Sequence, residues 1–225
     1  MTTLLKLTPL NAVSEHLGTR WLEVAGWRCA EAYGDVAAEI AAIRGTVGLA
    51  DVSAGGKLQI EGRQAGSMLA AALGAEPEAI GGHTRVEAGD LFCLRPDMYF
   101  LSTLPEAETA VQARLESAAA GRADLVTVTD VSHGLAGIEL VGPRAVDVLG
   151  RVCGLDFDAA AFPNLTARQS SLAKTKQLII RRDRGTLPGY ITFGARSLAA
   201  YVWGVLLEAG HAFGIAPVGL AALRS

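Results

Sequence analysis

Hydrophobic and polar positions follow the same order of patterns twice along the chain. Residues 49–62 (LADVSAGGKLQIEG) combine an Asp-Val-Ser loop, a glycine pair and a short alternating strand, and residues 128–142 (VTDVSHGLAGIELVG) repeat this arrangement. Alternation is typical of strands, and apolar residues three and four apart are typical of helices packed on one face. Each stretch is followed by patterns for a short helix, two strands joined by a turn, and a longer helix. We expect these elements at residues 64–74, 90–95, 99–103 and 106–120, and again at 145–154, 176–182, 190–193 and 197–209.

This repeated order predicts an α+β protein made of two similar halves packed together, not one long sheet. We assign the first half to residues 46–125 and the second to residues 126–225, with residues 1–45 as a lead-in that packs on the core. The linker at 74–89 is rich in glycine and is expected to be a loop with at most a short strand. The linker at 156–175 has low charge and is expected to cross the surface as a loop.

The lead-in is expected to contain two helices, at residues 10–17 and 36–44, joined by an aromatic loop that contains glycine. Asp35 is placed to cap the second helix. Trp27 and Tyr33 in the loop have two interpretations, because aromatic rings at such positions either line a pocket or pack against a sheet. The pattern alone leaves both open.

Hydropathy and charge argue against a membrane-spanning or nucleic-acid-binding protein. Half of the 225 residues are hydrophobic and the mean hydropathy is +0.30, yet no apolar run approaches the ~20 residues needed to span a bilayer. An apolar excess of this kind suggests a surface covered by a partner or ligand. The net charge is −3 and both signs are interspersed, so the sequence lacks the concentration of positive charge that is typical of nucleic-acid-binding proteins. The start of the chain lacks a signal-peptide pattern and the three cysteines are far apart, so we expect a cytoplasmic protein.

Several common sites are absent from the sequence. No G-x-G-x-x-G follows a strand, no phosphate-binding loop is complete, and no G-x-S-x-G elbow occurs. The four histidines are isolated from one another and from the cysteines, so we expect no metal site. Any catalysis is therefore expected to use carboxylates and a bound organic cofactor.

Specific residues resemble a known family. The first half is similar to the start of the aminomethyltransferases, the T-proteins of the glycine cleavage system. The matching residues there are Thr8-Pro9-Leu10, Ala25-Gly26-Trp27, Tyr33-Gly34, Arg44, Val47-Gly48-Leu49, Asp51-Val52-Ser53 and Gly56-Lys57. The second half resembles the gamma subunit of heterotetrameric sarcosine oxidase, a relative in the same folate-binding superfamily. The matching residues there are Asp130-Val131-Ser132-His133, Gly142-Pro143-Arg144-Ala145, Cys153-Gly154-Leu155-Asp156 and Ala161-Phe162-Pro163. Residues 203–220 again resemble a T-protein.

The resemblance implies two ferredoxin-like halves around a tetrahydrofolate pocket, without the C-terminal barrel domain that T-proteins carry. It implies a tetrahydrofolate-binding one-carbon transfer protein of the aminomethyltransferase type, acting on methylated or aminomethylated amines. The alternative is a non-catalytic small subunit, similar to the gamma subunit, that packs on a flavoprotein oxidase subunit. The sequence leans towards the transferase, and leaves open whether the chain is an enzyme.

Asp90 is the candidate catalytic residue. The resemblance aligns it with the second aspartate of a pair that precedes a similar strand in the family. A carboxylate there would stabilise the cationic character of a one-carbon unit as it leaves an amine. The other interpretation is that Asp90 caps the turn after Gly89.

The remaining candidates concern the cofactor. We expect Trp27, Tyr33, Tyr190 and Arg224 to contribute to cofactor binding. The resemblance also places Leu187 and Ile191 where T-proteins carry two glutamates, one of which reads the pteridine ring, so this chain departs from the family there.

Three further motifs have two interpretations each. Asp51 and Asp130 are interpreted as turn-forming residues in preference to catalysts, and His133 as a hydrogen-bonding residue in preference to an acid or base. Residues 181–184 (RRDR) form either a solvated hairpin tip or a site for the anionic tail of a folate or for an acidic partner.

Overall fold

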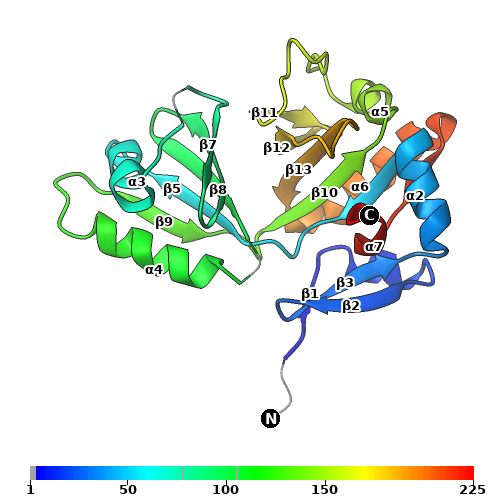
Figure 1. Cartoon of the computed structure of the whole chain (residues 1–225), viewed down its shortest axis with the longest axis horizontal. Helices are drawn as coiled ribbons and strands as arrows, with labels where there is room; N and C mark the ends of the chain where they lie inside the picture. The colour runs from blue at the N-terminus through cyan, green and yellow to red at the C-terminus, as the bar shows by residue number, and fades with distance from the viewer. Residues whose placement is uncertain (1–3, 78, 105) are drawn as a thin grey trace. The chain divides into compact units, whose positions relative to one another are not determined.

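The computed structural model describes residues 4–77, 79–104 and 106–225, and the chain divides into two compact units (Figure 1). The large unit comprises the residues up to Ala54, Leu135–Asn164 and Gln169–Ser225. The small unit comprises Gly55–Gly134 and Leu165–Arg168. Both units combine a β-sheet with helices, so the predicted α+β class is confirmed.

The large unit is built on a six-stranded sheet. Its order is β11 (Ala167–Leu172, which belongs to this unit from Gln169 on), β12 (Thr175–Arg181), β13 (Gly189–Ala195), β10 (Leu135–Val141), β4 (Val47–Asp51) and β14 (Ile215–Pro217). β10 runs antiparallel to both β13 and β4, and β14 runs parallel to β4. Helices α5 (Ala145–Val152) and α6 (Ala199–Gly210) bury Leu149, Trp203 and Leu206 in one core with Leu140 of β10.

A second, three-stranded sheet in the large unit contains residues that were predicted to form a loop. It has the order β1 (Lys6–Leu7), β3 (Trp27–Ala32), β2 (Arg20–Val24). The expected aromatic loop is therefore wrong: β2 and β3 form an antiparallel hairpin. Ala25 and Gly26 at its tip both have positive φ (53° and 75°), which is the conformation of a two-residue type I′ hairpin turn. The preceding helix is also shorter than expected, because α1 covers only Asn11–Glu15.

Glu39 links three separate segments of the large unit. It lies on α2 (Val36–Gly45), whose N-cap Asp35 accepts from the Ala37 N–H as predicted. The Glu39 side chain is 6% exposed. Its Oε1 accepts hydrogen bonds from the backbone N–H of Tyr33 (2.6 Å) and Gly34 (3.0 Å), and its Oε2 accepts from Gly219 N (2.8 Å). The carboxylate thus fixes the end of β3 and the start of α7 (Leu220–Leu223) relative to α2.

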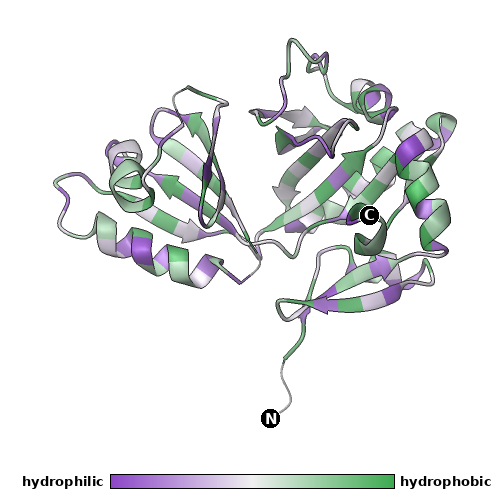
Figure 2. Ribbon diagram, viewed as in Figure 1, coloured by the Kyte–Doolittle hydropathy of each residue, from purple (hydrophilic) through white to green (hydrophobic). Residues whose placement is uncertain are grey.

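The small unit is built on a five-stranded sheet. Its order is β6 (His83–Val86), β7 (Gly89–Arg95), β8 (Met98–Thr103), β5 (Lys57–Glu61) and β9 (Thr127–Asp130). All its neighbouring strands are antiparallel. Helices α3 (Ala65–Leu73) and α4 (Glu108–Ala119) cover the sheet and complete its core. α4 mixes hydrophilic and hydrophobic residues along its length (Figure 2) and contributes Val111 and Leu115 to that core.

The leading strand of each sequence repeat pairs with the sheet of the other repeat. β4 precedes β5 along the chain but pairs with β10, and β9 precedes β10 but pairs with β5. After these strands the element order is the same, β5-α3-β6-β7-β8-α4 and β10-α5-β11-β12-β13-α6. The chain passes from one compact unit to the other after Ala54 and again after Gly134.

Both predicted linkers contain a strand. The linker at 74–89 holds the one short strand allowed for it, β6. The linker at 156–175 was wrongly expected to be a loop throughout, because it contains β11 at the sheet edge. In the described part of the chain, no helix has the length and apolar character needed to cross a bilayer.

Replacing Glu39 tests its role as the link between α2, β3 and α7. In Glu39→Gln one acceptor oxygen becomes an amide donor that faces a backbone N–H. We expect the free energy of unfolding to fall by about 2–3 kcal/mol, since a buried donor left unpaired costs ~1–3 kcal/mol. The measurement is chemical denaturation. The control is Glu31→Gln, which removes a largely exposed pair with Arg20 and should cost under ~1 kcal/mol. Equal losses in the two variants would contradict the role assigned to Glu39.

Candidate functional site

Asp90 lies at the second position of β7, in the small unit. The strand begins at Gly89, which has φ +152°, and a Cβ there would lie 2.0 Å from the Ser102 carbonyl oxygen. Only glycine fits this close approach. Asp90 pairs in register with Ser102 of β8 and Arg85 of β6. The sheet therefore fixes the backbone on both sides of the candidate carboxylate.

The Asp90 side chain is held by two basic residues of β6. Its Oδ1 accepts from His83 Nε2 at 2.9 Å and from Arg85 Nη1 at 2.8 Å, and Asp90 is 6% exposed. A carboxylate can only accept, so this contact places a proton on His83 Nε2. His83 is itself nearly buried against Phe92, with ring centroids 5.1 Å apart. Asp90 is thus a rigidly oriented, charge-balanced carboxylate, the kind of support that a positioned functional group needs.

The four residues expected to bind the cofactor all belong to the large unit. Trp27 of β3 is 2% exposed and has Lys6 Nζ 5.6 Å from its ring centroid. Tyr190 of β13 is fully buried; its hydroxyl donates to the Phe157 carbonyl at 3.2 Å. Arg224 follows α7 and is exposed. The structure therefore places Trp27 and Tyr190 in packed surroundings, and their role with a cofactor stays a prediction.

Tyr33 connects the end of β3 to the helical layer. Its hydroxyl lies 3.0 Å from Ser14 Oγ, and its ring centroid lies 6.5 Å from that of Trp203. Burial raises the pKa of Tyr33 to about 12, and burial likewise raises the pKa of Tyr190. Both phenols are therefore neutral hydrogen-bonding groups at physiological pH and do not act as bases.

The Asp-Val-Ser motif forms the same turn in both units. In the large unit Ser53 N donates to Asp51 Oδ1 (2.9 Å), Gly137 N donates to Ser53 Oγ (3.0 Å) and Val52 N donates to the Gly137 carbonyl (2.9 Å). This arrangement ties the end of β4 to β10. The prediction that Asp51 forms a turn is confirmed.

In the small unit the second copy of the motif makes the matching contacts. Ser132 N donates to Asp130 Oδ1 (2.8 Å), Lys57 N donates to Ser132 Oγ (2.8 Å) and Val131 N donates to the Lys57 carbonyl (2.9 Å). The end of β9 is thereby tied to the start of β5. Asp130 is a turn-forming residue, as predicted.

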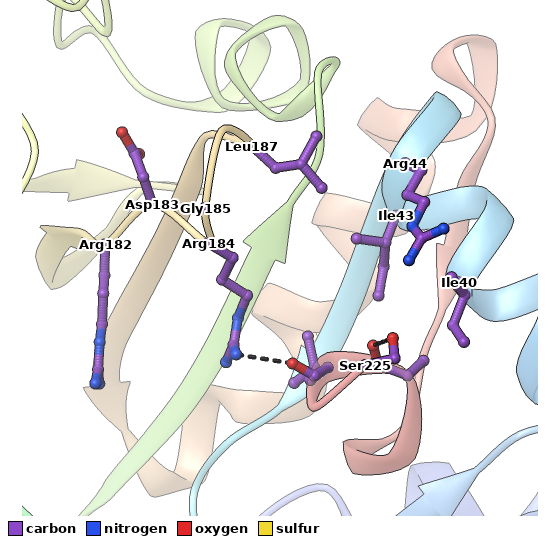
Figure 3. Close-up of a pocket in the computed structure, with 11 residues that line it drawn as sticks. Ile40, Ile43, Arg44, Arg182, Asp183, Arg184, Gly185, Leu187 and Ser225 are labelled. Atoms are coloured by element: carbon purple, nitrogen blue, oxygen red, sulfur yellow. Dashed lines mark hydrogen bonds between the residues drawn. The ribbon is translucent and has the colours of Figure 1, made fainter.

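A cavity of about 540 Å³ in the large unit was not predicted from the sequence (Figure 3). It lies between α2, the turn that joins β12 to β13, and α7. Its walls are both apolar and basic, and include Ile40, Ile43, Arg44, Arg182, Arg184 and Leu187. These residues come from segments far apart in the sequence, so no local pattern could reveal them. The one signal was the arginine-rich run at 181–184.

The turn beside this cavity is held by ion pairs. Arg181 forms two hydrogen bonds with Asp183, at 2.9 and 3.0 Å. Arg184 forms two with the buried Glu139 of β10, at 2.5 and 2.8 Å. The arginine run is therefore not simply a solvated tip, as one of its two interpretations held. Within the described ranges, no group of three or more His, Cys, Asp and Glu side chains could hold a metal ion.

Alkaline titration tests the surroundings of Tyr33. Because its pKa is raised to about 12 in the folded protein and lies near 10 in the unfolded chain, the folded state holds the proton longer. The stability that this provides is present below about pH 10 and is lost as the pH rises towards 12. The difference in phenolate absorbance between the parent and Tyr33→Phe should show no Tyr33 ionisation before about pH 11. Ionisation near pH 10 in a folded protein would show that the ring is solvated.

Comparison with known proteins shows which proteins this chain resembles. The profile of the GCVT N-terminal domain matches residues 86–225. The chain is 32% identical to the aminomethyltransferase of Saccharopolyspora erythraea, over 95% of this chain and 60% of the relative, and 29% identical to that of Chlorobium phaeovibrioides, over 97% and 62%. The chain thus spans about 60% of the length of the curated relatives that it matches.

Two solved structures share the fold. The glycine cleavage system aminomethyltransferase T from Bartonella henselae aligns with a TM-score of 0.81 at 24% identity, over 97% of this chain and 60% of that one. A chain of the heterotetrameric sarcosine oxidase from Corynebacterium sp. U-96 aligns with a TM-score of 0.72 at 24% identity, over 94% and 97%. The family match covers more than half of the chain and agrees with these neighbours. The chain therefore belongs to the GCVT N-terminal domain family, within the aminomethyltransferase superfamily.

Proposed function

We propose that the chain is a tetrahydrofolate-binding protein of one-carbon transfer that acts on methylated or aminomethylated amines, with Asp90 as its key carboxylate. The observation that carries this proposal is the geometry of Asp90 in a chain of this family. The carboxylate is nearly buried, it lies at the second position of a strand, and side chains on the neighbouring strand hold it in one orientation. We further propose that the two units are copies of one ferredoxin-like repeat, since they share their element order after the leading strands.

The residues present offer groups complementary to a folate. Folate carries carboxylates at one end, and the guanidinium groups that line the large-unit cavity are suited to carboxylates. When bound, tetrahydrofolate supplies the amine nitrogen that accepts the one-carbon unit. With an aminomethylated donor, whose carbon is already at the oxidation level of the transferred unit, Asp90 would stabilise the positive charge that develops on the carbon as its bond to the donor nitrogen breaks. A methylated amine would first have to lose two electrons to a flavin in a partner protein. The two groups that hold Asp90 would keep it from turning away while that charge develops.

The departures at Leu187 and Ile191 have structural counterparts. Leu187 lines the large-unit cavity, and Ile191 is 7% exposed on β13. Neither side chain can accept a hydrogen bond from a pteridine ring. In our proposal, these two positions therefore contribute no hydrogen bond to a folate.

Titration calorimetry with tetrahydrofolate and 5-formyltetrahydrofolate tests the proposal. We expect binding in the micromolar range and a loss of about tenfold in affinity for Asp90→Asn, which corresponds to ~1.4 kcal/mol. The matched control is Arg85→Gln, which removes one of the groups holding Asp90 but keeps the carboxylate. Its affinity should change less than that of Asp90→Asn, and circular dichroism should show both variants folded. Unchanged affinity in a folded Asp90→Asn would refute the role given to this residue.

A second candidate function is that of a small subunit bound to a flavoprotein oxidase. The observation that favours it is the alignment with 97% of one chain of the heterotetrameric sarcosine oxidase. Chemistry adds a reason, because a methylated amine must lose two electrons before its carbon can be transferred, and a flavin in a partner subunit could accept them. Lack of tetrahydrofolate binding, together with a stoichiometric flavoprotein in the purified assembly, would favour this candidate over the first.

A further inference from the structure

A second cavity of the large unit lies at the end of α5, and we call it the α5–α6 groove. Its volume of about 600 Å³ is within the range of small-molecule sites. Its walls come from the last turn of α5, the turn between β11 and β12, and one face of α6, and they include Arg151, Val152, Lys174, Tyr201 and Val205. No residue that lines it also lines the cavity beside Arg184. The groove is therefore a separate site in the same unit.

Backbone contacts hold the α5–α6 groove in shape. The N–H of Ala173, in the β11–β12 turn, donates to the Val152 carbonyl at the end of α5 at 2.9 Å. Cys153 forms an antiparallel bridge with Leu172 of β11. Ala173 and Lys174 both have positive φ (50° and 58°), a conformation that costs free energy for residues other than glycine. The turn thus presents Lys174 from a fixed backbone position at the edge of the groove.

Arg151 is oriented by an aromatic ring, and its N–H groups have no partner in the protein. Its guanidinium carbon lies 4.6 Å from the ring centroid of Phe213. Stacking of this kind uses the face of the guanidinium and leaves the donors at its edge available. Within the described ranges the Arg151 side chain forms neither a hydrogen bond nor a salt bridge. Arg151 therefore offers a prearranged set of donors to a ligand.

The groove carries a positive charge that nearby carboxylates do not cancel. Arg151 and Lys174 line it, whereas its lining contains no Asp or Glu. Asp147, one turn before Arg151 on α5, is bound by Arg144 at 2.6 Å. Glu208 of α6 lies outside the lining. Two cations beside one groove favour a doubly charged anion, and a phosphate monoester carries about −1.5 to −2 at neutral pH with three acceptor oxygens.

Another wall of the groove is aromatic and apolar. Tyr201 of α6 is 50% exposed, so much of its ring faces away from the core. Val205 lies one turn further along the same face of α6. A half-exposed ring beside an apolar side chain is a surface on which a flat aromatic group can stack. The groove thus offers a place for a ring as well as for an anion.

We infer that the α5–α6 groove binds a phosphorylated aromatic compound of the size of a mononucleotide, with its phosphate at Arg151 and Lys174 and its ring against Tyr201 and Val205. The inference goes beyond the proposed function, because it concerns a different ligand at different residues. A single carboxylate carries too little charge to match both cations. Inorganic phosphate matches the cations and leaves the aromatic wall uncovered.

Titration calorimetry with adenosine 5′-monophosphate, on the whole chain, tests the inference. We expect the parent protein to bind this probe, and Lys174→Gln and Arg151→Gln each to weaken binding about tenfold. The matched control is Lys176→Gln, which removes an exposed lysine of β12 that lies two residues further on and does not line the groove. Its affinity should stay within about twofold of the parent. Circular dichroism establishes that the variants are folded. No binding in the parent, or equal affinities in Lys174→Gln and Lys176→Gln, would overturn the inference.

Two fragments of the probe establish which groups are recognised. Adenosine lacks the phosphate and ribose 5-phosphate lacks the ring, so each should bind at least about tenfold more weakly than the whole probe. Tyr201→Ala should weaken binding of adenosine 5′-monophosphate and leave that of ribose 5-phosphate unchanged. Equally tight binding of ribose 5-phosphate or inorganic phosphate in the parent would mean a general anion site and would overturn the inference.

The same titrations separate this inference from the proposed function. Asp90→Asn should bind adenosine 5′-monophosphate as the parent does, and tetrahydrofolate should not displace the probe. Displacement of the probe by tetrahydrofolate would overturn the inference. A chain that binds the probe in a Lys174-dependent way and does not bind tetrahydrofolate would support the inference and refute the proposed function.

Discussion

The fold depends on one short turn that is used twice. Ser53 Oγ accepts a hydrogen bond from the backbone N–H of Gly137, near the start of β10. Ser132 Oγ accepts one from the backbone N–H of Lys57, at the start of β5. Each turn ends a leading strand and fixes it against an interior strand of the sheet in its unit. Since a one-residue slip would move every side chain of a strand to the opposite face, these contacts set the register on which each core is built.

Both candidate sites lie on strands positioned in this way. β10 carries Glu139, which binds Arg184 and so shapes the wall of the large-unit cavity. β5 pairs with β8, and β8 pairs with β7, which carries Asp90 at its second position. In both places a buried carboxylate is balanced by arginine, which limits the cost of removing its charge from water. The two units thus use the same arrangement to hold different functional groups.

Local patterns predicted most of the elements, because alternation and helical periodicity are properties of neighbouring residues. The Asp51 and Asp130 turns were predictable for the same reason. The hairpin around Ala25 was missed because its aromatic residues suggested a loop. The pairing of β4 with β10 and of β9 with β5 was missed because strand pairing depends on residues that are far apart in the sequence. Asp90 could be singled out through family resemblance, but its contacts with His83 and Arg85 depend on strand register. The arginine-lined cavity could not be predicted, because it forms only where three segments that are far apart in the sequence come together.

Hydrogen exchange of backbone amides tests most directly whether the two turns carry the fold. Ser53→Ala removes the acceptor of the Gly137 amide, and Ser132→Ala removes that of the Lys57 amide. We predict that each substitution accelerates exchange of its own amide by about tenfold or more and leaves the amide in the other unit protected, so that each variant is the control for the other. Unchanged exchange in both variants would contradict the account, and so would equal loosening of both units by either substitution.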